Sequence, residues 1–237
     1  MKIWRGFLFI FAMGCAACAP LFNTSDSDVG ARYLGARYVL DPLGEGVGYD
    51  SDPLIRFDAF DCTTFVETVL AAGDVSRLNK IRYAGGVVAF ENRNHFIETD
   101  WLTNNADLVE VVSGQYGATL LRNVVIDKRA WARVAHGMEI DVPVQTASLE
   151  YIPYELLGAI DNTAPLIVLF VVSPRADSNA KLATDIAVVH MGFLLPGGKV
   201  LRHASTGRGV MDDDFAQYVA KRHKMRNNIG IALVKIK

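Results

Sequence analysis

The sequence is 237 residues long, 51% of them hydrophobic and 21% charged, and its net charge is −2. This composition excludes a disordered or fibrous protein, and the near-neutral charge argues against a nucleic-acid partner. Two of the three cysteines, Cys15 and Cys18, lie in the first eighteen residues, which leaves Cys62 alone in the rest of the chain. A single thiol cannot build a disulfide framework.

The first segment, residues 1–18, has the layout of an export signal. A basic start with Lys2 and Arg5 precedes an apolar stretch and then small residues around Gly14. The apolar stretch is about ten residues long, whereas a membrane-spanning helix needs roughly twenty. We therefore expect no permanent anchor helix, a tether over residues 19–32, and one folded domain over residues 33–237.

The small residues directly before Cys15 and before Cys18 resemble the cleavage site of bacterial lipoproteins, although neither site has the common Leu three residues earlier. Two alternatives stay open. Either one of these cysteines is acylated and ties the domain to a membrane surface, or the signal is cleaved without lipid. In both cases we expect the protein in the bacterial envelope, in the periplasm or anchored to a membrane by lipid.

The first strong element of the mature chain is a helix over residues 61–73. It follows an irregular, partly helical lead-in over residues 19–57 that is rich in Gly, Asp, Pro and Tyr. Asp61 is a good helix cap, apolar side chains recur at helical spacing, and Gly73 is a good terminator. This pattern places Cys62 at the first position of the helix.

The middle of the chain has weaker signals. Residues 81–86 and 93–102 predict loop and short helix, and residues 105–126 show no clean period. Between residues 146 and 161 a helix is predicted around Pro153, because proline is favoured in a first helical turn.

The last third predicts strands of a mainly antiparallel sheet, because it is rich in branched apolar residues. The expected strands are residues 166–172, 185–195, 199–204 and 230–236. A Pro-Gly-Gly turn at residues 196–198 joins two of them. His190 and His203 are therefore expected on adjacent strands.

Cys62 is the candidate nucleophile. A thiol reacts as the thiolate, and a helix N-terminus together with an imidazolium can lower its pKa from about 8.5 to roughly 3.5–7.5. The chain offers five histidines as partners. His223 lies in a charged run that is typical of a surface, and His136 lies at the end of a short predicted helix, so neither is the expected base.

His190 is the better candidate for a base, because it interrupts an apolar strand where a polar side chain needs a purpose or a partner. Fixed on a strand, it would act as a general base. His203, across the hairpin, would orient it and select its tautomer. On the residues alone, a satisfied core histidine remains the alternative for each of them.

Three stretches together resemble the NlpC-type cysteine peptidases of bacterial cell walls, a papain-like superfamily. They are Asp-Cys-Thr-Thr-Phe-Val-Glu at residues 61–67, His-Met-Gly-Phe at 190–193 and His-Ala-Ser at 203–205. Within that superfamily the chain is similar to the group described as N-acetylmuramoyl-L-alanine amidase-like, whose middle segment residues 81–83 and 93–101 also resemble. The resemblance covers residues 33–237.

The resemblance implies an α+β fold of the papain-like NlpC type, in which a nucleophile-bearing helix packs on a small antiparallel sheet. Cys62 would be the nucleophile, His190 the general base and His203 the third member of the site. The thiolate would attack an amide carbon, and the Cys62 backbone N–H with another donor would hold the oxyanion. The implied chemistry needs no metal and no other cofactor.

Peptidoglycan or a muropeptide is the substrate that the resemblance implies, for a protein that we expect to be a monomer. Tyr49 and Asp61 are candidates for substrate contact, although a helix cap explains Asp61 equally well. His95 and Trp101 could line the cleft, together with Asp100. Their alternative roles are an aromatic plug and a surface pair.

The sequence departs from the more familiar members of the superfamily at Thr63 and Thr64, where those members have Ser and Gly. It also lacks their wall-binding repeats. Substrate details of those members are therefore not carried over to this chain.

Three functions remain as hypotheses. The leading one is an exported cysteine amidohydrolase of peptidoglycan that cuts the muramoyl-to-L-alanine amide or a bond within the stem peptide. The second is a non-catalytic envelope lipoprotein that binds wall fragments and has an inert thiol. The third and weakest is a metal hydrolase using His95, His190 and His203, because the sequence has no close pair such as H-x-x-x-H.

Overall fold

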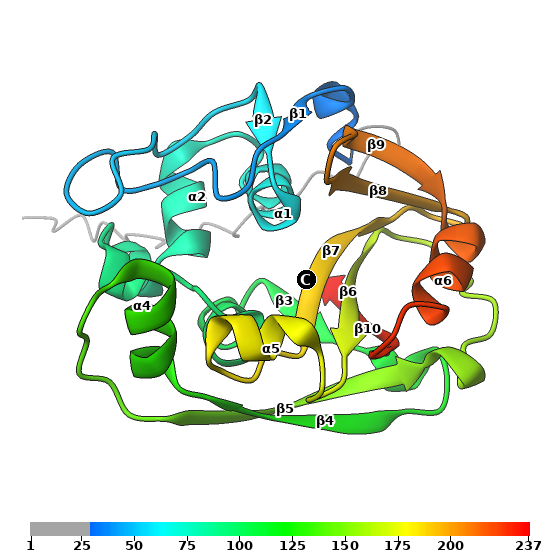
Figure 1. Ribbon diagram of the computed structural model, residues 1–237. Helices are drawn as coiled ribbons and strands as arrows, with labels where there is room; N and C mark the ends of the chain where they lie inside the picture. The colour runs from blue at the N-terminus through cyan, green and yellow to red at the C-terminus, as the bar shows by residue number, and fades with distance from the viewer. Residues whose placement is uncertain (1–28) are drawn as a thin grey trace, which may run out of the picture.

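The computed structural model describes residues 29–237, in which a large β-sheet is combined with helices (Figure 1). The predicted export signal with Cys15 and Cys18, and most of the predicted tether, lie outside the described residues. Among the residues described, no helix is long and apolar enough to cross a bilayer.

The main sheet has eight strands, seven of which follow the order β4-β5-β10-β6-β7-β8-β9, and β3 also pairs with β10. Every pairing in it is antiparallel. Its strands are β3 Val109–Val111, β4 Leu120–Ile126, β5 Gln145–Pro153, β6 Leu166–Val172, β7 Val188–Leu194, β8 Val200–Ser205, β9 Gly209–Asp214 and β10 Asn228–Ile236. A short parallel pair, β1 Arg37–Tyr38 with β2 Ala59–Phe60, accompanies it. The expected α+β class with a mainly antiparallel sheet is confirmed.

Strand β6 lies near the middle of the sheet, and all seven of its residues are buried. Ile167, Leu169 and Val171 belong to the core cluster that contains the residues of α1. Leu166, Val168 and Phe170 belong to a second cluster on the other face, which contains Phe215 of α6. Because both faces of this strand are covered, its sequence reads as a continuous apolar run.

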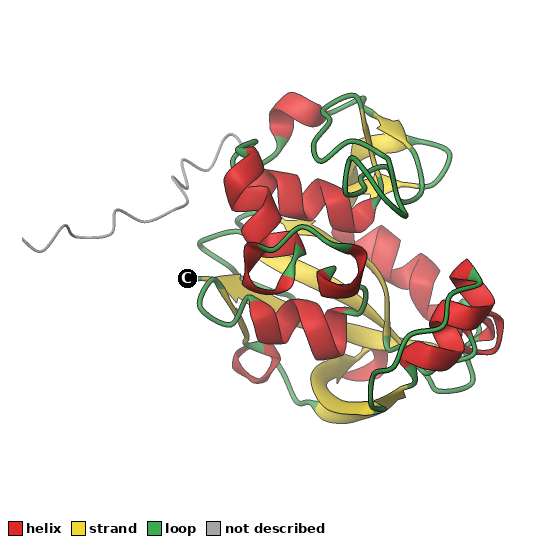
Figure 2. Cartoon of the chain, turned by 90° about the vertical axis from the view of Figure 1, so that its left-hand side faces the viewer, coloured by secondary structure: helices red, strands yellow, loops and turns green. Residues whose placement is uncertain are grey.

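The helices are short and gather mostly on one side of the sheet (Figure 2). The α-helices are α1 Cys62–Leu70, α2 Val75–Arg82, α3 Leu102–Asn104, α4 Lys128–His136, α5 Asp177–Leu182 and α6 Phe215–His223. Single turns complete the set: η1 Ala31–Tyr33, η2 Ala84–Gly86, η3 Phe90–Asn92, the π-helical η4 Ile97–Trp101, η5 Ser113–Gln115 and η6 Tyr154–Leu156. Helix α1 packs against the sheet through the edge-to-face contact of Phe65 with Phe193 of β7, whose ring centroids are 5.9 Å apart.

Helix α1 has the structure that its sequence predicts. The Asp61 carboxylate accepts the Thr64 N–H at 2.7 Å, and the Thr64 hydroxyl accepts the Asp61 N–H at 3.0 Å. This reciprocal pair is a capping box, in which two otherwise unpaired backbone donors at a helix start are satisfied. Thr64, one of the departures from the familiar superfamily pattern, thus has a structural reason.

The prediction of a helix around Pro153 is wrong. Residues Gln145–Pro153 form strand β5, and only the single turn η6 follows. Pairing with β4 and with β10 decides the conformation of this segment, since both neighbours satisfy its backbone groups. Most of helix α2 lies before residues 81–86, which were expected to be loop and short helix. Its sequence did not reveal it, because only Leu78 and Ile81 of its apolar residues reach the core and its apolar stripe is weak.

Candidate active site

The N-terminus of α1 presents the Cys62 side chain to the first half of β7. The ladder between β7 and β8 consists of the pairs Phe193 with Arg202 and Leu194 with Leu201. This leaves the Met191 N–H free to donate a hydrogen bond to the Cys62 sulfur. The predicted position of Cys62, at the first residue of a helix, is confirmed.

The Cys62 thiol is protonated in this environment. Burial, together with the nearby Asp61 carboxylate, raises its pKa to about 12. The hydrogen bonds from Met191 and Thr63 act in the opposite direction but are the smaller effect. The expectation that the helix start lowers this pKa is wrong, because removal of the thiolate from water outweighs the favourable dipole.

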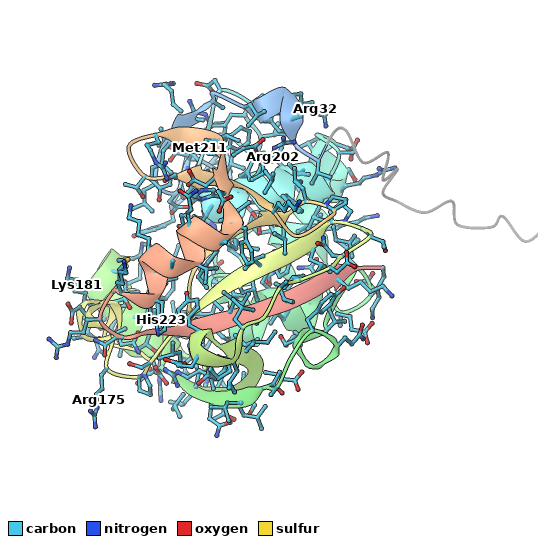
Figure 3. The ribbon with its side chains drawn as sticks, turned by 90° about the vertical axis from the view of Figure 1, so that its right-hand side faces the viewer. Arg32, Arg175, Lys181, Arg202, Met211 and His223 are labelled. Atoms are coloured by element: carbon cyan, nitrogen blue, oxygen red, sulfur yellow. The ribbon has the colours of Figure 1, made fainter. Side chains whose placement is uncertain are left out.

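His190, His203 and Asp213 form a hydrogen-bonded chain that leads away from the thiol. The distance from His190 Nε2 to His203 Nδ1 is 2.7 Å, and that from His203 Nε2 to the Asp213 carboxylate is 3.0 Å. The two histidines lie on adjacent strands, as their spacing predicts. Asp213 lies on β9, one residue beyond Asp212, and Figure 3 shows β9 and its labelled Met211 beside Arg202 of β8.

The hydrogen bonds among His190, His203 and Asp213 fix the tautomers of both imidazoles. Burial is the main cause that lowers the pKa of His190 and of His203, so both rings are neutral near pH 7. Asp213 is held ionised: against the effect of burial, hydrogen bonds from Arg208 and His203 lower its pKa. A carboxylate only accepts, so His203 carries its proton on Nε2 and accepts at Nδ1 from His190 Nε2–H. The remaining nitrogen of His190, Nδ1, is then an unprotonated base.

Two features of β7 bring His190 into place. Gly192 lies where an added Cβ would be 2.7 Å from the Cβ of His203, so glycine permits the close approach of the strands. Phe170 pairs with His190 and Val171 with Val188, which makes Val189 the extra residue of a bulge. Bulges turn a strand locally and re-aim the following side chains.

Glu98 fastens the strand just before this bulge. One of its carboxylate oxygens accepts the N–H groups of Ala187 and Val188, both at 2.6 Å. Glu98 is itself buried in the π-helical turn η4. It therefore fixes the backbone two residues before His190 from a segment that lies some ninety positions earlier in the chain.

Two pockets meet at Cys62 and His190, and both residues line both pockets. The first, which we name the aromatic pocket, has a volume of about 340 Å³, and its walls include His95, Phe96 and Trp131. The second, which we name the basic pocket, has a volume of about 400 Å³ and is lined by residues of β1, of the turn between β8 and β9, and of α6. Thiol and imidazole thus lie in the middle of an extended cleft.

His95 lies where a substrate-contacting residue is expected, on the wall of the aromatic pocket. Its Nε2–H donates to the Phe90 carbonyl at 2.9 Å, and its ring centroid is 4.5 Å from that of Trp131. Burial lowers its pKa to about 3, so the ring is neutral. Tyr49 lies on the outer side of the same aromatic cluster, 4.7 Å from the Phe90 ring. It is half exposed and does not line the pocket with His95.

Trp101 does not line either pocket, because it is fully buried in the core beside α1. The alternative of an aromatic plug fits it, and substrate contact does not. Asp100 is also buried and pairs with Lys128 at 2.5 Å, so it is not a surface pair. Asp61 caps α1, as described above, and also accepts the Asp41 N–H at 3.1 Å.

The remaining histidines take structural positions. His136 is the last residue of α4 and packs against the Trp131 ring at 4.7 Å. His223 ends α6 and lies 3.1 Å from the Glu155 carboxylate at the surface. Over residues 29–237 there is no group of three or more His, Cys, Asp or Glu side chains arranged to hold a metal ion.

Asp213, Glu98 and Arg222 contribute to the cleft or support it, and the sequence did not reveal them. Asp213 stands within a run of three aspartates, residues 212–214, at a strand end that carries no motif. Glu98 acts through two backbone groups, which leave no trace in a sequence. Arg222 belongs to a charged run that is typical of a surface, whereas its side chain reaches the basic pocket.

Comparisons with known proteins identify a family and a shared fold. The model of the AmiA-like family, described as N-acetylmuramoyl-L-alanine amidase-like, matches residues 28–228. A search of curated proteins finds no match. Among solved structures, a Legionella pneumophila protein is similar with a TM-score of 0.78 at 22% identity, over 89% of this chain and 87% of that chain. An N-acetylmuramoyl-L-alanine amidase from Bacteroides uniformis is similar with a TM-score of 0.67 at 22% identity, over 88% of this chain and 96% of its own.

Proposed function

The chain belongs to the N-acetylmuramoyl-L-alanine amidase-like family, and on that premise we propose that it is a cysteine hydrolase that cuts the amide between N-acetylmuramic acid and L-alanine. The observation that carries the proposal is the chain of hydrogen bonds from Asp213 through His203 to His190, which ends at an unprotonated nitrogen in the cleft that Cys62 lines. The same arrangement supports an NlpC-type, papain-like fold for the domain.

The reaction begins from a neutral thiol and a neutral imidazole. His190 Nδ1 takes the thiol proton while the sulfur attacks the amide carbon, and the charge moves onto the amide oxygen. His203 accepts a hydrogen bond from the imidazolium that forms, and the Asp213 carboxylate accepts one from His203. Both residues therefore stabilise the positive charge on His190. His190 then gives the proton to the leaving amine, and a thioester on Cys62 remains.

Water completes the cycle. His190, neutral again after the amine has left, removes a proton from a water molecule that attacks the thioester carbon. The carbon–sulfur bond breaks, the proton returns to the sulfur, and the carboxylic acid of the muramoyl half is released. Cys62 and His190 return to their starting protonation states, and no cofactor takes part.

The proposal includes the location of the protein. We propose that residues 1–18 direct export, and that the enzyme acts as a monomer in the bacterial envelope, free or held by a lipid on Cys15 or Cys18. The layout of a basic start, an apolar stretch and small residues supports this part.

The test is a product assay with purified muropeptides. Wild-type protein is expected to release L-alanyl peptides and free muramic acid ends, identified by mass spectrometry. Cys62→Ala should lower the rate by at least about 1,000-fold. His223→Ala is the matched control, because its side chain lies at the end of α6 outside the two pockets, and it should retain the wild-type rate. Equal rates for wild type and Cys62→Ala would refute the cysteine mechanism.

One observation favours the non-catalytic alternative, in which the domain binds wall fragments without cutting them. The raised pKa of Cys62 makes the resting thiol a poor nucleophile. A protein that binds muropeptides but yields no product, with Cys62 unmodified by iodoacetamide at pH 7 even in the presence of muropeptides, would establish that alternative. Products cut within the stem peptide would instead identify an endopeptidase with the same site.

A further inference from the structure

The basic pocket collects positive charge on one side of the reacting groups. Arg208, Lys221 and Arg222 line it together with Cys62 and His190. We propose that this pocket binds a carboxylate of the amine half of the substrate, the half that leaves as an L-alanyl peptide. The inference rests on the proposed function and deepens it by fixing the direction in which the substrate lies.

Helix α6 supplies one wall of the pocket. Its residues Tyr218, Lys221 and Arg222 line the pocket, and Met225 follows just beyond the end of the helix. Their spacing of three and four residues places them on one face of a helix. Figure 3 shows α6 lying along the side of the sheet, with His223 labelled at its end. The helix therefore turns two adjacent cations toward the cleft, although its sequence reads as a charged surface run.

The three cations differ in whether their charge is already neutralised. Arg208 contacts the Asp213 carboxylate at 2.7 Å, which also accepts from His203. Within residues 29–237, neither Lys221 nor Arg222 forms an ion pair. Lys221 is exposed at the mouth of the pocket. Two positive charges are thus available to a ligand.

Arg222 is the more informative of the two. Its guanidinium lies over the Phe170 ring, 5.4 Å from the centroid, and Phe170 in turn contacts His190. Its Nε and one terminal nitrogen are buried and form no well-aligned hydrogen bond, although the Tyr154 hydroxyl lies near the guanidinium. A guanidinium that is partly buried without an anion is costly. A carboxylate in the pocket would offset that cost, with the remaining terminal nitrogen of Arg222 and the ammonium of Lys221 as donors.

The aromatic pocket on the other side of the thiol has the opposite character. Apolar side chains including Ile97, Leu182 and Ile186 extend the wall formed by His95, Phe96 and Trp131. Its one carboxylate, that of Glu98, is engaged with the backbone of β7. This pocket suits an uncharged ring with apolar faces, because aromatic walls bury such faces without an ionic partner.

The two halves of N-acetylmuramoyl-L-alanine match this division. The lactyl carboxyl group of the muramoyl half is consumed in the scissile amide, so that half is neutral. The alanine, or the peptide that extends it, carries a free carboxylate. Placing the sugar in the aromatic pocket and the carboxylate in the basic pocket sets the amide at Cys62, where the two pockets meet.

A matched pair of ligands tests the inference. N-acetylmuramoyl-L-alanine and its C-terminal carboxamide differ only in the charge at the proposed contact. Dissociation constants are measured by calorimetry on the Cys62→Ala protein, in which no turnover occurs. The free acid should bind about tenfold or more tightly than the carboxamide, because only the acid can form charge-assisted hydrogen bonds with Lys221 and Arg222.

Variants assign that preference to residues. Lys221→Gln and Arg222→Gln, each in the Cys62→Ala background, should weaken binding of the acid and leave that of the carboxamide unchanged. Arg222→Lys should restore part of the preference. Lys224→Gln is the control, because Lys224 is an exposed cation at the end of α6 outside the pocket, and it should keep the full preference.

Equal dissociation constants for the acid and the carboxamide would overturn the inference. It would also be overturned if Arg222→Gln weakened the binding of both ligands equally and Lys221→Gln weakened neither. The outcome is separable from that of the proposed function. A preference for the acid that depends on Lys221 and Arg222 supports the pocket even if wild-type protein cuts neither compound, and hydrolysis of both compounds at equal rates supports the amidase while removing the pocket.

Discussion

In the proposed mechanism, Asp213 acts on Cys62 through two imidazoles. It would affect the reaction by fixing the tautomer of His190, because it contacts neither the thiol nor the substrate. As a carboxylate it can only accept from His203 Nε2, and this choice propagates to leave His190 Nδ1 unprotonated. An amide at the same position can donate, which permits the opposite tautomers. His190 would then carry a proton on the nitrogen that should act as a base.

We predict that Asp213→Asn lowers kcat about 100-fold with little change in KM, because substitution of the orienting carboxylate in a comparable catalytic chain is severe. Steady-state kinetics on a muropeptide measure both constants. Asp212→Asn is the control, since Asp212 pairs with Arg202 instead of His203, and it should stay within about twofold of wild type. A normal kcat in Asp213→Asn would show that the base does not depend on this carboxylate.

The proposed mechanism has a characteristic pH dependence, because it starts from a neutral thiol and a neutral imidazole. It requires an unprotonated His190, and burial holds the pKa of His190 below the usual 6.5. The thiol has a pKa of about 12. We predict that kcat/KM is level from pH 7 to pH 9 and falls only below pH 6.5, as His190 takes up a proton. A rise of about tenfold per pH unit between pH 7 and pH 9 would instead indicate reaction of a free thiolate in bulk equilibrium.

Sequence alone locates the proposed reacting residues better than those that support them. Cys62 follows a helix cap, and His190 and His203 interrupt apolar strands, so each stands out against its neighbours. Asp213 has no such contrast, because it lies among other aspartates and its role depends on the pairing of β8 with β9. Trp101 resembles a cleft residue in sequence but lies in the core, since an aromatic residue has no local mark that distinguishes the two positions.

At the scale of elements, the site depends on where β7 begins. The π-helical turn η4 reaches across to this strand through Glu98, whose carboxylate accepts two consecutive N–H groups ahead of the bulge at Val189. Without an acceptor, both N–H groups would be buried and unpaired. The position of His190 on the cleft wall therefore depends on a side chain of a different element.

Glu98→Ala is predicted to lower the free energy of unfolding by about 2–4 kcal/mol, since each unpaired buried donor costs roughly 1–3 kcal/mol. Urea denaturation measures this loss, and kcat should fall with it because His190 loses its fixed position. Glu98→Gln should preserve most of both, as the amide oxygen can accept the same two bonds. A Gln variant as damaged as the Ala variant would indicate that the charge of Glu98, rather than its accepting oxygen, matters.

Elements whose own residues specify them are predictable, and those specified by distant partners are less so. Strand β6 is covered on both faces and is therefore continuously apolar, and α1 carries its own cap and terminator. Strand β5 contains residues that suit a helix start, yet β4 and β10 pair with it. Strand β9 and α6 are rich in charged residues, which hide their periodicity. Yet β9 supplies Asp213 of the hydrogen-bonded chain, and α6 supplies a wall of the basic pocket.

The folded protein holds several imidazoles in their neutral form, and its free energy of unfolding therefore decreases at low pH. The folded pKa of His95 is about 3, against a reference value of 6.5, with burial as the main cause. Between these values the unfolded chain binds a proton that the folded protein does not. Stability is therefore complete above pH 6.5 and decreases as the pH falls below it, by about 1.4 kcal/mol per pH unit for each such histidine.

We predict that His95→Gln reduces this acid sensitivity. The Gln amide can still donate to the Phe90 carbonyl but does not titrate. Thermal unfolding followed at pH 8, 6 and 5 should show a smaller drop in Tm for the variant than for wild type. The difference between the two proteins should be constant above pH 7, where the histidine is neutral in both states. Parallel Tm curves down to pH 5 would contradict the lowered pKa.

Strand β10, which lies between β5 and β6 and also pairs with β3, has a consequence for the rate of folding. Its residues Asn228–Ile236 pair with segments of the chain that lie far from them in the sequence. Without β10, the facing edges of β5 and β6 would have no partner. The sheet therefore depends on pairings of long sequence separation, so the protein should fold more slowly than a helical protein of similar length.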